Sequence, residues 1–400
     1  MLACASIYRN TGKVQLCNKQ CQEVLALEPS NIDASLLMAD ILYQQSEGEE
    51  AIKHFAQILE QNPFHYHALA RYLELVWRRG NVELMEKALR NPLENNPRVV
   101  VDAGYNYCRG LAEWFTGELH EALQAFNRAR RDLEWGERAL YNMIEICLSS
   151  CHENVAIDAD ANEIRDVRNE TNEDDFGVKA AERFFKELRL KPGTEQKYKL
   201  IENFIALAST NKLDVQSALA NFLDMCHVEN GEAENNNNLN VGAVLGSARA
   251  YIILKQTPKA KAQLKLVLNY PWNLEDADYL QQCMLLLVEL YINQGKHEQA
   301  TAVLRTILQH NASCSKAYEY MGYICEKDQK YSDSASNYEV AWKLCKNQNA
   351  TIGYKLAYNY CKCRRFFECI EVCHMVLKKY PDYPKIKKEI LDKARANIRI

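Results

Sequence analysis

The sharpest cluster of side chains able to do chemistry lies near the C-terminus. Cys361, Cys363, Cys369, Cys373 and His374 place five potential metal ligands within fourteen positions. Thiolates and imidazoles are the ligands that zinc prefers. The set lacks the paired spacing of a strong zinc site, and free cysteine is among the most buried residue types. We therefore predict that these cysteines pack in a core and that the chain holds no structural zinc.

No other motif supports catalysis or a cofactor. The sequence has no glycine-rich phosphate-binding loop ending in Gly-Lys-Ser/Thr and no Gly-x-Gly-x-x-Gly. His120 and His152 are each followed by glutamate, but neither has a second histidine four residues later, as the helix of a zinc protease requires. The 9 histidines are dispersed, which makes a catalytic triad improbable. We predict a protein that is not an enzyme and has no cofactor.

Composition narrows the class of protein. The 400 residues are 48% hydrophobic and 26% charged, with only 9 Pro and 15 Gly, which excludes collagen and wholesale disorder. The net charge of −4 gives no basic field that would attract nucleic acid. An odd count of 15 scattered cysteines indicates a reduced, intracellular compartment. No apolar run approaches the ~18 residues of a membrane span, so we expect a soluble chain without membrane insertion.

A period of 34 residues is visible along the chain. Pro29, Pro63 and Pro97 recur at that interval, each after an apolar stretch, and proline commonly follows a helix end. A 34-residue frame begun at 32 places Ala39 eighth, Ala51 twentieth, Phe55 twenty-fourth and Pro63 thirty-second. This resembles the tetratricopeptide repeat, in which small residues sit where two helices touch.

The same frame recovers further copies, including Gly110 with Phe126 and Gly322 with Tyr338. In this frame Cys369 and Cys373 take buried helix-packing positions. We count about eight or nine helix pairs from the period. The resulting fold class is all-α, a right-handed superhelical solenoid of antiparallel helix pairs.

Two stretches interrupt the repeats. Residues 151–177 hold nine acidic residues against two arginines, and residues 229–242 contain four consecutive asparagines. We predict both as loops, the first inserted within a repeat, because neither can bury much apolar surface. The organisation that follows is an N-terminal repeat block at 1–150 with its first repeat clipped, the acidic insertion at 151–177, helical repeats at 178–228, the Asn-rich loop at 229–242, a C-terminal repeat block at 243–382, and a basic capping helix at 383–400.

Binding residues are expected on the first helix of each pair, which lines the concave groove of this fold. The candidates are tyrosines, which supply area and a polar tip, beside Glu289, Lys316 and Glu319. The tyrosines are Tyr43, Tyr323, Tyr354 and Tyr358. Packing between helices is the alternative for each of them, because the two kinds of position adjoin.

The basic C-terminal segment is the second candidate surface. Lys385, Lys387 and Lys388 lie within it and could dock onto an acidic partner. The alternative is a solvated cap, because terminal repeats need a polar outer face. A clamp for chaperone tails is disfavoured, since Leu36 and Asp40 occupy the places of its lysine and asparagine.

The amino-acid sequences of several segments indicate a narrower family than the repeat pattern alone does. The segments are LLMADILYQ (36–44), ALARYLELVWRRGN (68–81), YNYCRGLAEW (105–114) and LAYNYCKC (356–363). They resemble the C-terminal half of the large tetratricopeptide-repeat subunit of intraflagellar-transport complex A. The resemblance implies a scaffold in retrograde ciliary transport and ciliary cargo entry, located in the cytoplasm and the cilium, at axoneme and basal body. It implies as partners the other subunits of that complex and adaptors of ciliary membrane-protein cargo. The alternative function is a generic adaptor of a ubiquitin-ligase or glycosyltransferase assembly.

Overall fold

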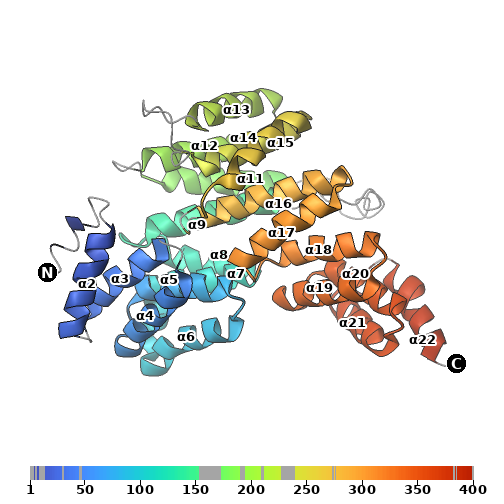
Figure 1. The fold of residues 1–400 in the computed structure, drawn as a ribbon, viewed down its shortest axis with the longest axis horizontal. Helices are drawn as coiled ribbons and strands as arrows, with labels where there is room; N and C mark the ends of the chain where they lie inside the picture. The colour runs from blue at the N-terminus through green and yellow to red at the C-terminus, as the bar shows by residue number, and fades with distance from the viewer. Residues whose placement is uncertain are drawn as a thin grey trace.

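Helices follow one another along the whole described chain. The computed structural model describes residues 4, 7–8, 14–28, 31–44, 47–152, 173–189, 194–208, 211–226, 239–272, 274, 276–381, 383 and 385–398. Every regular element in these ranges is helical, and successive helices pack in pairs (Figure 1). The prediction of an all-helical solenoid of helix pairs is confirmed.

The N-terminal part of the solenoid runs to the acidic segment. Its helices are α2 (Val14–Leu27), α3 (Ile32–Gln44), α4 (Gly48–Gln61), α5 (Tyr66–Arg78), α6 (Val82–Asn95), the 3-10 helix η1 (Pro97–Val101), α7 (Ala103–Phe115), α8 (Leu119–Ala129) and α9 (Gly136–His152). Pro97, at the predicted repeat boundary, is the first residue of η1.

The remaining helices follow in the same alternation. They are α11 (Glu173–Glu187), α12 (Glu195–Ala208), α13 (Lys212–Cys226), α14 (Val241–Ile253), α15 (Thr257–Leu266), η4 (Val267–Asn269), α16 (Ala277–Asn293), α17 (His297–His310), α18 (Ser315–Lys327), α19 (Tyr331–Leu344), α20 (Ala350–Lys362), α21 (Phe366–Lys379), the π-helical η5 (Ile386–Leu391) and α22 (Asp392–Ile398). None of the described helices is long and apolar enough to cross a membrane.

Small residues let the two helices of a pair approach each other. A Cβ atom built on Gly110 of α7 would lie 2.8 Å from the ring of Phe126 on α8. A Cβ atom on Gly322 of α18 would lie 2.9 Å from the ring of Tyr338 on α19. Both pairs are 16 residues apart, the spacing between the eighth and twenty-fourth places of the repeat frame. The small residue is therefore a packing requirement, as the sequence indicated.

The first helix of a pair often ends on a residue with positive φ. Gly80 follows α5 at φ 81°, and Gly295 follows α16 at φ 68°. A left-handed residue at this place closes the helix end, and glycine adopts it without a Cβ penalty. Sharp turns here send the second helix back along the first, which produces the antiparallel pairs.

Parts of the two segments predicted as loops are helical at their ends. Residues 151–152 end α9 and residues 173–177 begin α11, while 153–172 lie outside the described residues. Residues 241–242 belong to α14, capped by the side chain of Asn240, and residues 227–238 lie outside the described ranges.

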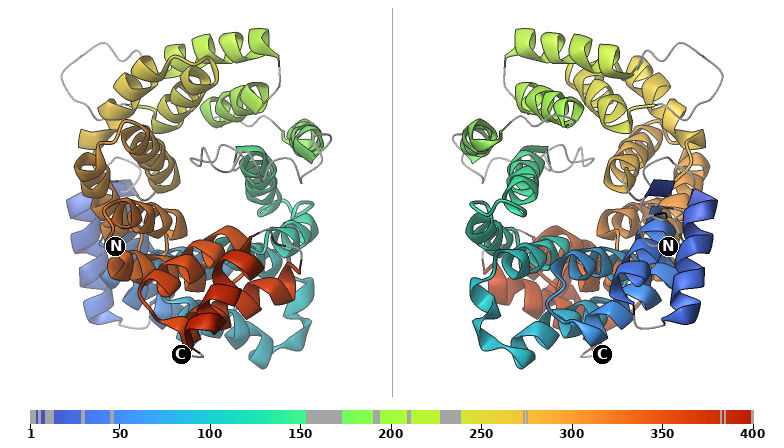
Figure 2. Two further views of the ribbon diagram at one scale, coloured as in Figure 1. Left: turned by 90° about the vertical axis from the view of Figure 1, so that its right-hand side faces the viewer. Right: turned by 90° about the vertical axis from the view of Figure 1, so that its left-hand side faces the viewer.

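The chain of pairs curves back on itself. First helices of neighbouring pairs pack together, as α5 does with α7 and α14 with α16, so they form what we call the inner face. The curvature brings the segment from α16 to α19 beside the segment from α5 to α8, although the two are far apart in sequence (Figures 1 and 2). Three apolar cores lie along this path, built mainly from residues 17–146, 140–324 and 335–394.

Candidate protein-binding surface

Only part of the C-terminal cysteine cluster belongs to the helix core, because Cys361 and Cys363 are half-buried and His374 is exposed. Cys369 and Cys373 of α21 are completely buried in the last apolar core, as predicted. A hydrogen bond with Cys373 and burial both raise the pKa of the Cys369 thiol, so it stays protonated. Among the described residues no group of three or more His, Cys, Asp or Glu side chains is placed to hold a metal ion. These thiols act here as small packing residues.

Tyr43 does not present its side chain to a partner. It is only 2% exposed, and the Arg71 guanidinium lies 4.4 Å above its ring. Burial raises the pKa of the Tyr43 hydroxyl, and the nearby Glu74 carboxylate adds to this shift. Its expected role on the groove is corrected to interhelix packing, because the neighbouring first helix α5 covers it.

Tyr354 holds the C-terminal segment in place. Its hydroxyl donates a hydrogen bond of 3.2 Å to Oε2 of Glu389 in η5, and its ring centroid lies 6.1 Å from that of Tyr383. Burial and the Glu389 carboxylate raise the pKa of Tyr354 to about 12. The side chain is half-buried, so it serves the packing of the cap and leaves part of its surface on the inner face.

Tyr323 and Tyr358 share one local arrangement. Each is half-buried on a first helix, and each has a lysine four residues later lying over its ring. Lys327 Nζ is 5.1 Å from the Tyr323 ring centroid, and Lys362 Nζ is 5.3 Å from that of Tyr358. An aromatic face beneath an exposed cation provides both apolar area and charge for recognition. The structure thus keeps these two tyrosines as candidates on α18 and α20.

A buried carboxylate joins these two helices. Glu319 of α18 accepts from Lys316 at 2.9 Å and from Lys355 of α20 at 3.2 Å. Burial alone would raise the pKa of Glu319, but the two lysines outweigh burial and the net shift is downward. Lys355 was missed by sequence reasoning. Its separation of 36 residues from Glu319, close to one repeat, is the signal that could have found it.

A second charged group occupies the inner face in an earlier part of the solenoid. Arg249 of α14 donates to Gln282 of α16 at 2.8 Å, again about one repeat apart. Burial raises the pKa of Glu145 on α9 to about 7; Asp278 adds to the rise, while Lys197 and Arg249 oppose it. Sequence reasoning missed Glu145 because its charged neighbours come from three other helices.

The three lysines of the C-terminal end lie exposed on one short segment. Lys385 precedes η5 in a left-handed conformation, φ 68°, and Lys387 and Lys388 project from η5 itself. The buried residues of the same segment, Ile386 and Ile390, pack into the last core. This alternation produces a basic outer surface on an anchored cap, and docking there remains a prediction.

Comparison with known proteins gives the family. The C-terminal ARM domain of tetratricopeptide repeat protein 21 matches residues 180–395, and the fifth ARM repeats domain of the same family matches residues 33–148. The tetratricopeptide repeat protein 21 homolog of Caenorhabditis elegans is 40% identical over 399 residues, covering 100% of this chain and 30% of that protein.

Another curated relative gives the same result. Tetratricopeptide repeat protein 21B of Homo sapiens is 43% identical over 337 residues, covering 83% of this chain and 25% of that protein. A solved structure of the APC/C hetero-tetramer Cut9–Hcn1 has a TM-score of 0.38 at 10% identity, covering 99% of this chain and 89% of that chain. The chain spans less than a third of the length of the curated relatives it matches. It belongs to the tetratricopeptide repeat protein 21 family, a family of helical-repeat scaffolds.

Proposed function

We propose that this chain is a non-catalytic scaffold segment of the ciliary transport machinery, acting within intraflagellar-transport complex A in retrograde transport and cargo entry. Family membership over most of the chain is the observation that carries the proposal. Its partners are the other subunits of that complex and adaptors of ciliary membrane-protein cargo. Its place is the cytoplasm and the cilium, at axoneme and basal body.

The geometry supplies a mechanism for such a scaffold. Consecutive first helices are fixed by contacts one repeat apart, such as Lys355 with Glu319 and Arg249 with Gln282. A partner lying along them meets a surface that is already ordered, so binding costs little conformational entropy. Tyr323 and Tyr358, each beneath a lysine, would provide the aromatic anchors of that surface.

The test compares two matched variants in ciliated cells. One replaces Tyr323 and Tyr358 with Ala on the inner face, and the control replaces Phe367, an exposed aromatic on the second helix α21. Tyr354 is left intact because its loss would free η5. The tagged chain and both variants are scored for entry into cilia and for recovery of other transport subunits.

We expect the unmodified chain and the Phe367→Ala control to enter cilia and recover transport subunits. The double variant should lose partner affinity by about 2 kcal/mol or more, as anchors at a binding centre do. A folded, tagged chain that neither enters cilia nor recovers transport subunits would refute the ciliary assignment and favour the generic adaptor. Equal recovery of transport subunits with all three proteins would show that Tyr323 and Tyr358 are not part of the binding surface.

A further inference from the structure

Among the described residues, three polar side-chain contacts join positions 200 or more apart. Most side-chain contacts of the solenoid lie within one repeat or between neighbouring repeats, so these three stand out. They join the C-terminal end of α5 to α16 and to the turn before α18, and the start of α8 to the turn after α19. The pairs are Arg78 with Asp278, Trp77 with Ser313, and Glu118 with Lys346.

The turn between α17 and α18 closes the end of α5. The backbone N–H of Ala312 donates to the carbonyl oxygen of Arg78 at 2.8 Å, and the Ser313 hydroxyl donates to that of Trp77 at 2.5 Å. The last carbonyls of a helix lack partners within it, so they are natural acceptors for another segment. Completely buried Asn311 holds the turn by accepting from the Ser313 N–H at 3.0 Å. The turn between α17 and α18 therefore caps the C-terminal end of α5, although it belongs to a distant part of the chain.

A buried cation reinforces this junction. Arg78 is 3% exposed, and its Nη2 donates to Asp278 at 2.8 Å and to Glu74 of its own helix at 3.2 Å. Its Nε and Nη1 have no hydrogen-bond partner among the described residues. A guanidinium removed from water with some donors unpaired depends on the carboxylates that remain. Asp278, on the opposite side of the junction, is therefore needed to keep Arg78 buried.

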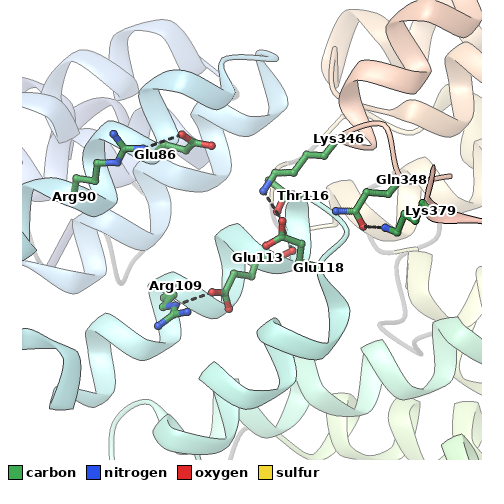
Figure 3. Close-up of polar contacts among 9 residues, drawn as sticks. All are labelled: Glu86, Arg90, Arg109, Glu113, Thr116, Glu118, Lys346, Gln348 and Lys379. Carbon is green, nitrogen blue, oxygen red and sulfur yellow. Dashed lines mark hydrogen bonds and ion pairs between the residues drawn. The ribbon is translucent and has the colours of Figure 1, made fainter. Parts of the chain in front are cut away.

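Two more contacts widen the junction. Lys346, in the turn after α19, extends to Glu118 at the start of α8, with 2.9 Å between Nζ and Oε1 (Figure 3). Lys346 and Asn347 hold φ of 48° and 59°, an uncommon backbone conformation for residues with a side chain. Leu274, between η4 and α16, is 8% exposed and packs into the N-terminal core. Apolar contacts, ion pairs and hydrogen bonds thus all join the segment from α5 to α8 to the segment from α16 to α19.

We propose that these residues form a latch, which we call the closure latch, that holds α5 to α8 against α16 to α19. When closed, it fixes the curvature of the solenoid and encloses the inner face between these segments. When open, it lets the two segments separate and gives a partner access to that face. The proposal concerns the conformation of this chain and stands or falls independently of the ciliary assignment.

The test measures one distance across the junction by electron paramagnetic resonance. Spin labels are attached to keto amino acids placed at Lys87 of α6 and Ser336 of α19, since both residues are exposed and 15 native cysteines rule out thiol labelling. The opening variant carries Asp278→Lys and Lys346→Glu, which places like charges at both ion pairs. Adding Glu118→Lys restores one pair. Arg90→Gln is the matched control, since it removes the pair with Glu86 inside α6 and leaves the junction untouched (Figure 3).

The unmodified 400-residue chain and the Arg90→Gln control should give one narrow distance distribution. The opening variant should broaden it and shift it by several ångströms to longer distance, and Glu118→Lys should reverse part of that change. A folded opening variant with an unchanged narrow distribution would overturn the latch. A broad distribution in the unmodified chain would overturn it as well. Should the opening variant fail to fold, Lys346→Glu with and without Glu118→Lys tests the same prediction at an exposed pair.

Discussion

At the scale of single residues, the inner face places carboxylates in two opposite electrostatic situations. Glu319 lies between two lysines, which lower its pKa and keep it charged. Glu145 is instead dominated by burial, which raises its pKa to about 7. The same side chain type is therefore a fixed anion at one place and a titrating group at the other. Among the described residues, cations lie within hydrogen-bond distance of Glu319 but not of Glu145.

The shift at Glu145 predicts a pH dependence of stability. Its pKa in the folded chain lies above the ordinary value of 4.5, so the folded state binds more protons between about pH 4.5 and 7 and loses stability as the pH rises through that window. Glu145→Gln should therefore raise the free energy of unfolding by about 1–3 kcal/mol at pH 8 and change it little at pH 4. Urea unfolding at both pH values measures this.

Glu121, which is exposed on α8, provides the control for that experiment. Glu121→Gln should change stability little at either pH, because substitutions of exposed side chains usually have small effects on stability. A gain from Glu145→Gln that is equal at pH 4 and pH 8 would contradict the electrostatic explanation and indicate a packing effect instead.

At the scale of helix pairs, the repeat frame predicted the packing well. It identified the small residues and the aromatics 16 positions later, such as Gly110 with Phe126, because these contacts lie within one pair. It also placed Cys369 and Cys373 in the core. It could not distinguish tyrosines covered by the next pair, such as Tyr43, from those left on the inner face, such as Tyr323. That difference depends on the exact rotation of each pair against its neighbour.

A single added methyl group tests this packing. Gly322→Ala would place a Cβ atom 2.9 Å from the buried ring of Tyr338, and the two helices would have to separate slightly. We expect a loss of about 1–3 kcal/mol in the free energy of unfolding, typical of overpacked cores. Chemical denaturation of the purified chain measures the loss.

Gly48→Ala is the matched substitution in the same fold. Its Cβ atom would meet Leu75 at 3.6 Å, an ordinary contact, so stability should be unchanged or slightly higher. If Gly322→Ala proved as stable as Gly48→Ala, close approach would not be the reason for the small residue in the repeat.

At the scale of the whole molecule, the return of the solenoid onto itself was beyond sequence reasoning. The frame gives each repeat a neighbour but says little about residues such as Arg78 and Asp278, which are 200 positions apart. Small rotations between successive pairs accumulate, and their sum decides which segments meet. The sequence therefore predicted the elements and their pairing, while closure had to be seen in three dimensions.

The basic C-terminal end should affect how the whole molecule associates with a partner. Reversing Lys385, Lys387 and Lys388 to Glu should slow association with an acidic partner about tenfold or more at low salt, and by less at high salt, because exposed charges mainly steer encounter. Stopped-flow association at two ionic strengths checks this. The control reverses Lys87, Lys212 and Lys265, exposed on α6, α13 and α15, with the same change in net charge. Equal slowing by both sets would indicate a general charge effect without a docking site.

The closure latch also has a consequence for how the chain is made. Ser313 is 236 residues beyond Trp77, so the ribosome needs about 10–50 s after the end of α5 to produce its cap. Throughout that interval the helix end and the guanidinium of Arg78 are in water, and the N-terminal core lacks Leu274. The nascent N-terminal repeats therefore expose a temporary contact surface to other molecules near the ribosome. The chain covers that surface itself once translation has passed the turn after α17.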